Sequence, residues 1–158
     1  MSQFRVEKVR AEAELTLSSG ERLQGCFFLT ASSATHAGPE RVADLLNSES
    51  GFFPFETVDP VDTVLVNRGH LVAARLVAAT DEVRLDSGYD VATVRRVIMK
   101  LSNRVVLRGM VRIYRPEGRD RLSDYTRSPE SFRYLESTEG TFIVNVAHVV
   151  ELADRDRD

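Results

Sequence analysis

The chain has one cysteine and no tryptophan among its 158 residues. Cys26 has no second thiol to pair with, which excludes an intramolecular disulfide and a cysteine-based zinc cluster. No apolar run approaches the roughly 20 residues that span a bilayer. The N-terminal stretch MSQFRVEKVRAEAE is charged throughout, where a secretory signal has an apolar centre. These absences predict a cytoplasmic protein that does not contact a membrane.

The sequence also lacks the motifs of the common catalytic and metal centres. It contains three histidines, and no pair of them has the His-x-x-x-His spacing of a zinc site. A Gly-x-Ser-x-Gly nucleophile turn, a phosphate-binding glycine loop and a dinucleotide fingerprint are absent as well. We therefore expect a non-catalytic protein with no metal ion and no cofactor.

Three blocks of sequence occur twice, in the same order. In the clearest pair, TVLVNRGHLV at residues 63–72 returns as TFIVNVAHVV at residues 141–150, with Asn and His in the same places. Such self-similarity is typical of a chain built from two copies of one structural unit. The other two pairs are LSSGERLQG with LSNRVVLRG (residues 17–25 and 101–109), and residues 41–56 with residues 121–136. We predict a first unit at 1–80, a linker at 81–90, a second unit at 91–153 and a charged tail at 154–158.

The residue pattern within a unit predicts short strands and one short helix. Apolar and polar residues alternate over Val9–Leu17, which is the period of a half-buried strand. A glycine inside the next strand, Gly25 or Gly109, marks a sharp bend or a close backbone approach. An apolar stripe at Val42, Leu45 and Leu46 predicts a helix before a third strand, FFPF, whose Pro54 indicates a sheet edge. The fold class is therefore mainly β with short helices. We expect two tandem small β-barrels of about 70 residues, each with a helix inserted between strands two and three.

Two segments of the first unit resemble the Sm motifs of Sm-like proteins, a family of SH3-like small β-barrels. LTLSSGERLQGCFFL is similar to the first Sm motif, and VLVNRGHLVAARL is similar to the second, in which an Arg-Gly turn joins strands four and five. The resemblance implies a non-catalytic protein that assembles into rings and binds RNA. Only Asn67, Arg68 and Gly69 match the family's nucleotide-contacting positions, and the second unit has Val146-Ala147 at the Arg-Gly turn.

Residues that both units share most simply serve the fold. Asn67 and Asn145 can bond their own turns through the side chain, and His70 and His148 follow them at the same spacing. We therefore predict a structural turn role for these four residues. Arg68 with its glycine occurs once, so it is a candidate for a binding role that belongs to the first unit.

Charge is unevenly distributed along the chain. Residues 95–133 hold eleven Lys or Arg against four Asp or Glu, a net charge of +7, while the rest of the chain carries −10. Strand alternation predicts that five of these cations share one outward face. They are Arg96, Lys100, Arg104, Arg108 and Arg112.

This basic face has three interpretations. It is the solvated exterior of a sheet, a nucleic-acid-binding surface, or a surface that contacts the acidic unit of a neighbouring copy. The leading hypothesis is a non-catalytic interaction or assembly module whose basic face contacts an acidic protein surface or its own neighbour in a head-to-tail homo-oligomer. The alternative is an Sm-like RNA-binding protein that uses the turn at Arg68 and the same face.

Overall fold

The computed structural model describes residues 8–31, 38–77, 82–114 and 121–155, which form ten strands, two short α-helices and four 3₁₀ turns. The strands are β1 (Lys8–Leu17), β2 (Arg22–Thr30), β3 (Phe52–Val58), β4 (Val61–Asn67), β5 (Leu71–Leu76), β6 (Thr93–Leu101), β7 (Val106–Ile113), β8 (Phe132–Ser137), β9 (Gly140–Asn145) and β10 (Val149–Asp154). The helices are α1 (Val42–Ser48) and α2 (Leu122–Thr126), and the 3₁₀ turns are η1 (Arg68–His70), η2 (Glu82–Leu85), η3 (Tyr89–Val91) and η4 (Val146–His148).

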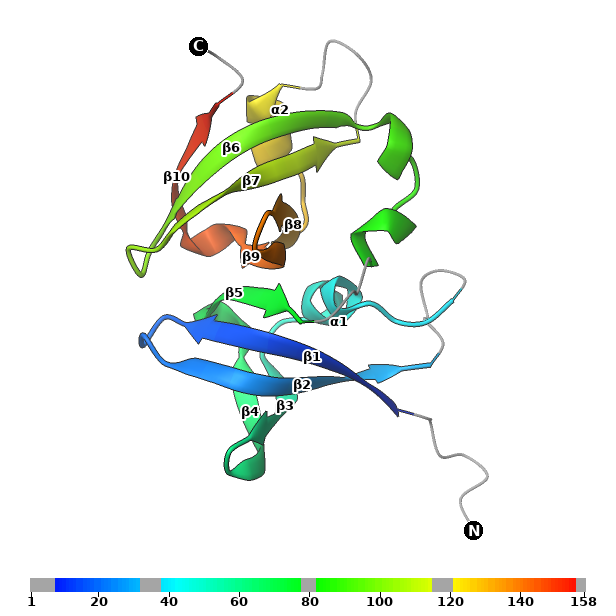
Figure 1. Cartoon of the computed structure of the whole chain (residues 1–158), viewed down its shortest axis with the longest axis vertical. Helices are drawn as coiled ribbons and strands as arrows, with labels where there is room; N and C mark the ends of the chain where they lie inside the picture. Colours follow the sequence, from blue (N-terminus) through cyan, green and yellow to red (C-terminus); the bar gives the residue numbers. More distant parts are fainter. Residues whose placement is uncertain (1–7, 32–37, 78–81, 115–120, 156–158) are drawn as a thin grey trace.

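All ten strands of the described chain belong to one antiparallel sheet with the order β10-β6-β7-β8-β9-β5-β1-β2-β3-β4. We call β1–β5 with α1 the N-terminal half and β6–β10 with α2 the C-terminal half; Figure 1 shows them one above the other. Within each half the fifth strand comes first and is followed by strands one to four. The halves join where β5 pairs with β9, so β4 and β10 are the two ends of the sheet. The predicted mainly β class with short helices is confirmed.

Each half contains a glycine at which two strands approach too closely for a side chain. A Cβ atom on Gly25 would lie 1.9 Å from the Glu56 carbonyl oxygen, and one on Gly109 would lie 2.5 Å from that of Glu136. Both distances are far below van der Waals contact. Only glycine therefore allows β2 to pair with β3, and β7 to pair with β8, at this separation.

The core consists of two clusters that exchange residues across the junction of the halves. The N-terminal cluster is built from β1–β5 and α1, and it also contains Phe132 and Ile143 from the C-terminal half. The C-terminal cluster likewise contains Val72 and Ala73 from β5. The junction therefore continues the core packing through both halves.

Helix α1 follows β2 in the chain and buries Val42, Ala43 and Leu46, while Leu45 of the predicted stripe is only partly buried. The α1 N-terminus is held by a capping box, in which the Asp44 carboxylate accepts the Arg41 backbone N–H at 2.9 Å. No helix in the described part of the chain has the length and apolarity needed to cross a membrane.

Two local predictions differ from the structure. Pro54 does not lie on an edge strand, because β3 lies between β2 and β4. The pairing of β3 with β2 reaches only Phe55, so the missing N–H of Pro54 is tolerated. The predicted linker at 81–90 contains η2, in which Glu82 and Val83 are buried. This segment therefore contributes to the packed structure as well as joining the halves.

Candidate functional site

The two 3₁₀ turns that connect strands four and five have the same geometry. The Asn67 Oδ1 atom accepts the backbone N–H two residues ahead at 2.9 Å, and Asn145 Oδ1 makes the same bond at 3.0 Å. The Arg68 backbone N–H donates to the Gly51 carbonyl at 2.8 Å, and the Val146 N–H donates to the Ser131 carbonyl at the same distance. Each asparagine thus closes its own turn through its side chain.

The histidines that end these turns bond to serines in the turn between the first two strands of each half. His70 Nδ1 lies 2.7 Å from Ser18 Oγ, and His148 Nδ1 lies 2.7 Å from Ser102 Oγ. His148 Nε2 also lies 2.7 Å from the Gly69 carbonyl oxygen. A carbonyl only accepts, so His148 Nε2 carries the proton and its Nδ1 accepts from the serine hydroxyl.

Arg68, the first candidate for nucleotide contact, is buried with 4% of its surface exposed. Its Nη1 donates to the Phe52 carbonyl at 2.8 Å, and its Nη2 donates to the Leu45 carbonyl at 3.0 Å. Burial lowers the pKa of the guanidinium; the nearest carboxylate, that of Glu49, is 3.8 Å away and largely exposed. Arg68 therefore ties the end of α1 to β3 and does not present its charge to solvent.

In the C-terminal half the corresponding task belongs to Arg133 on β8. Its Nη1 donates to the Tyr125 carbonyl, its Nη2 to the Ser128 carbonyl at 2.6 Å and its Nε to the Glu130 carbonyl at 2.9 Å. These carbonyls lie in and after α2, where Thr126 Oγ1 also donates to the Ser123 carbonyl at 2.7 Å. An arginine therefore stabilises the end of the helix in both halves, from the turn in one and from the strand in the other.

The junction between the halves is an antiparallel strand pair reinforced by side chains from the end of β9 and from η4. The Asn145 Nδ2 atom donates to the carbonyls of Arg68 at 3.2 Å and Leu71 at 3.0 Å, and His148 donates to Gly69. Asn145 is 4% exposed, so these bonds satisfy a buried amide. The strand register is Ala73 with Val144, Ala74 with Ile143 and Arg75 with Phe142.

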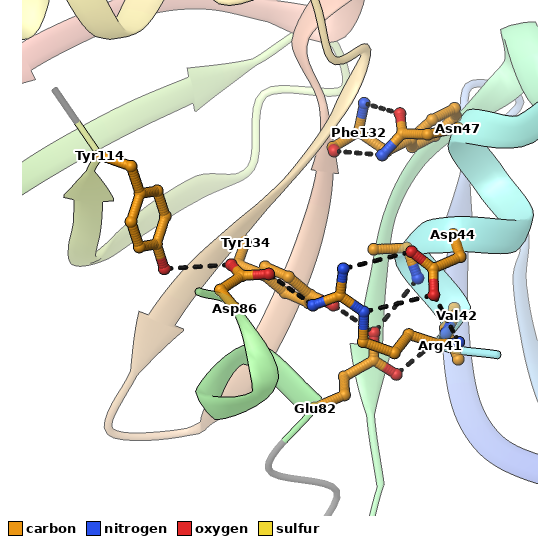
Figure 2. A network of polar contacts seen from close by, with 10 residues as sticks. Arg41, Val42, Asp44, Asn47, Glu82, Asp86, Tyr114, Phe132 and Tyr134 are labelled. Carbon is orange, nitrogen blue, oxygen red and sulfur yellow. Dashed lines mark hydrogen bonds and ion pairs between the residues drawn. The ribbon is translucent and has the colours of Figure 1, made fainter. Parts of the chain in front are cut away.

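Helix α1 of the N-terminal half also covers the C-terminal half beside this junction. The Asn47 side chain donates to the Phe132 carbonyl and accepts the Phe132 N–H, both at 2.9 Å, as Figure 2 shows. Phe132 is 5% exposed and Ile143 is 0% exposed. The outward face of β8 and β9 is therefore part of a packed interface.

The two ends of the sheet expose the residues that correspond to those buried at the junction. Leu65 on β4 is 68% exposed, whereas its counterpart 78 positions later, Ile143, is 0% exposed. Val150 on β10 is 66% exposed, whereas its counterpart Val72 is 0% exposed. Exposed apolar side chains at an unpaired strand edge are typical of surfaces that bind another chain.

The exposed residues on the β4 side form one patch, which we call the outer patch: Phe52, Pro54 and Leu65. The β3–β4 register places them on the same face, with Pro54 opposite Leu65 and Phe52 opposite Asn67. Phe52 is 59% exposed, whereas its counterpart Phe132 is covered by α1.

The predicted basic face is only partly available. The β6–β7 register places Arg96, Lys100, Arg108 and Arg112 on one face, while Arg104 lies in the connecting turn with a φ of 71°. Lys100 is 3.1 Å from the carboxylate of Glu151.

Arg112 is the least exposed residue of this face, because its guanidinium is held against the sheet. Its Nε donates to Glu136 Oε2 at 2.7 Å, and the guanidinium lies 3.6 Å from the centre of the Tyr89 ring. The pKa of Arg112 is raised: burial opposes this, but the hydrogen bond and charge of Glu136 outweigh it. Arg112 therefore stabilises the C-terminal half and is a poor contact for a partner.

Two residues of the basic face, Arg96 and Arg108, line an open hollow of about 750 Å³. Four arginines and one carboxylate line it, and that carboxylate belongs to Glu136, which Arg112 already neutralises. The arginines are Arg84, Arg96, Arg108 and Arg155. The hollow is thus a strongly basic concave surface.

A larger cleft of about 920 Å³ lies between the helices and contains the polar network of Figure 2. Arg41 bonds both Asp44 and Asp86, and Tyr134 donates to Glu82, whose carboxylate also accepts the first N–H groups of α1. Burial and the adjacent Glu82 charge raise the pKa of Tyr134. The Arg41 cation is paired with two carboxylates, whereas the Glu82 carboxylate is bonded by a hydroxyl and by backbone N–H groups. The network connects α1, η2 and β8.

No protein-family model, curated protein or solved structure matches this chain.

Several residues that build these surfaces carry no sequence signal of their role. Asn47 and Arg133 bond to backbone atoms distant in the chain or in a loop, and neither belongs to a recognisable motif. The repeat itself contained a usable signal, because Asn47 and Arg133 stand where the other unit has Arg127 and Phe53. Asn47 and Arg133 are thus positions at which the two units differ, and they contribute to the junction and to the end of α2 respectively.

Proposed function

We propose that the chain is a non-catalytic assembly module made of two tandem Sm-like small β-barrels, residues 1–80 and 91–153, that associates head to tail with its own copies. The repeated strand order, the matching turns and the close strand contacts at Gly25 and Gly109 support a duplicated barrel with a helix inserted between strands two and three. The β5–β9 pair is then an interface between two copies of one unit, and it happens to lie within one chain.

The observation that carries this proposal is the contrast between Ile143 and Leu65, which are equivalent residues at 0% and 68% exposure. The fourth strand of one unit pairs with the fifth strand of the other at the junction, and the remaining fourth and fifth strands are open. A second copy can repeat the junction by pairing its β4 with β10 of the first. By the same register, Val66, Leu65 and Val64 would lie opposite Glu151, Leu152 and Ala153 of the next copy.

Such an association has a polarity, because it joins two different edges. Contacts between unlike surfaces close into a ring when the rotation per copy allows it, and otherwise continue as a filament. Burying a side chain such as Leu65, Phe52 or Val150 contributes on the order of 1.5–3 kcal/mol before the cost of association is subtracted.

Sedimentation equilibrium over a range of concentrations tests the proposal. We expect the wild type to associate to multiples of 17.7 kDa, and Leu65→Lys to stay monomeric with an unchanged circular dichroism spectrum. The matched control is Val106→Lys, at another exposed strand position away from both edges. A wild type that stays monomeric at every concentration would overturn the proposal.

The basic hollow supports a second contact, with an acidic protein surface or with RNA. Arg108 lines it, whereas Arg68 takes no part because its guanidinium is buried. Phosphate binding predicts an affinity for single-stranded RNA that falls steeply with salt and weakens in Arg108→Glu. RNA binding that Arg108→Glu leaves unchanged, or the absence of binding at low salt, would exclude the RNA alternative at this hollow.

A further inference from the structure

We propose that Asn67 and His70 fix the register of the head-to-tail contact by donating hydrogen bonds to backbone carbonyls of the next copy. This inference rests on the proposed head-to-tail association, and it names the atoms that would align one copy with the next. The acceptors are the carbonyl oxygens of Val146, Ala147 and Val149 at the β10 end of the neighbouring copy.

The junction within the chain provides the pattern. There the Asn145 amide and the His148 Nε2 atom reach across to three carbonyls, those of Arg68, Gly69 and Leu71, at 2.7 to 3.2 Å. The three bonds cross from a turn of one half to the turn of the other. They therefore fix the register of β9 against β5 as well as the distance between the two strands.

Asn67 and His70 have the same local geometry as Asn145 and His148, but their outward atoms have no partner among the described residues. The Asn67 Oδ1 atom is used within its turn, and the His70 Nδ1 atom is used by Ser18. Among the described residues, nothing accepts a bond from Asn67 Nδ2 or from His70 Nε2. The donors are oriented as at the junction, because each is fixed by the bond made through the other end of the same side chain.

The carbonyls at the other end of the molecule can accept these bonds. The Val146 carbonyl already accepts the N–H of Val149, as the Arg68 carbonyl accepts that of Leu71. A carbonyl oxygen has two lone pairs, and at the junction the second lone pair of Arg68 receives the Asn145 amide. The same second position remains on Val146 for Asn67 of the next copy.

These bonds would select one register among several. A shift of β4 along β10 by one residue turns Leu65 to the opposite face of the sheet and separates both donor groups from their three acceptors. Backbone pairing alone gives little discrimination between registers, so the burial of Leu65 and the bonds of the turn side chains supply it together.

The test separates the turn bond from the intermolecular bond. Asn67→Asp keeps the oxygen that accepts the Gly69 N–H and replaces the outward amide with a carboxylate oxygen, which cannot donate. We expect sedimentation equilibrium to show at least tenfold weaker association, with the unfolding midpoint of the dilute protein close to that of the wild type. Asn67→Ser, which also keeps an acceptor and lacks the long donor, serves as a second variant if the aspartate prevents folding.

The outcomes distinguish this inference from the proposal on which it depends. Association of Asn67→Asp and Asn67→Ser with wild-type affinity would overturn the register role while leaving the head-to-tail assembly intact. A monomeric wild type would overturn the assembly, and the inference with it. Weak association of both variants, together with a wild type that assembles, supports the inference.

Discussion

The turn at Arg68-Gly69 carries a guanidinium that bonds to the end of α1, whereas the turn at Val146-Ala147 carries no such side chain. Both halves need a guanidinium at the end of the inserted helix, and the N-terminal half supplies it from the turn while the C-terminal half supplies it from Arg133 on β8. The equivalent carbonyls of Phe52 and Phe132 are also bonded by different side chains. Arg68 donates to the Phe52 carbonyl, and Asn47 donates to the Phe132 carbonyl. A residue present in only one unit can therefore have a structural role.

The fourth and fifth strands of the two halves differ in whether their edges are paired. The edges of β9 and β5 are buried against each other, whereas the equivalent edges of β4 and β10 are open and apolar. The burial of the β9 and β5 edges inside one chain thus suggests that the equivalent β4 and β10 edges are buried between chains.

The largest effect on stability is expected at Gly25 and Gly109, where neighbouring strands approach closely. Gly25→Ala should destabilise the fold by more than about 3 kcal/mol, because the new methyl group would overlap the Glu56 backbone. Gly109→Ala, with a 2.5 Å approach to Glu136, should cost less. Urea unfolding of both variants measures the difference, and equal stability of Gly25→Ala and wild type would contradict the close approach.

Arg68→Met should destabilise the protein by about 2–3 kcal/mol, because two buried carbonyls lose their donors. Val146→Ala, at the equivalent turn position, should cost less than about 1 kcal/mol, since Val146 bears no such bonds through its side chain. Denaturant midpoints give both values. Similar losses for the two variants would show that Arg68 has no special structural role.

Asn145→Ala should cost about 2 kcal/mol in the dilute protein, because it removes a turn bond and two bonds across the junction. Asn67→Ala removes only the turn bond and should cost about 1 kcal/mol under the same conditions. Thermal unfolding at low concentration, where copies are separate, compares the two. Equal losses would mean that the junction bonds of Asn145 contribute nothing net.

The smallest effect is expected at Arg108. Arg108→Glu should leave the unfolding midpoint unchanged because the residue is exposed, whereas Arg112→Glu should lower it by replacing a bonded cation with an anion beside Glu136. Unfolding curves of the two variants check this contrast. A large loss in Arg108→Glu would show that this part of the basic face is structural.

The alternation of apolar residues was sufficient to predict the strands and the mainly β class. The asparagine of each turn was recognisable because Asn bonds its own backbone at short range, and such local chemistry is visible in sequence. The burial of Arg68 was not predictable, because it depends on carbonyls of Phe52 and Leu45 that only the folded chain brings near. The pairing of Arg112 with Glu136 was hidden for the same reason.

The most direct test of head-to-tail association mixes two variants that each block one edge. Leu65→Lys disables the β4 edge and Val150→Lys disables the β10 edge, so each should be monomeric alone. Head-to-tail association predicts that an equimolar mixture forms a 1:1 complex of twice the monomer mass by light scattering, because each variant retains the edge that the other needs. A mixture that stays monomeric while the wild type assembles, or assembly of either variant alone, would contradict it.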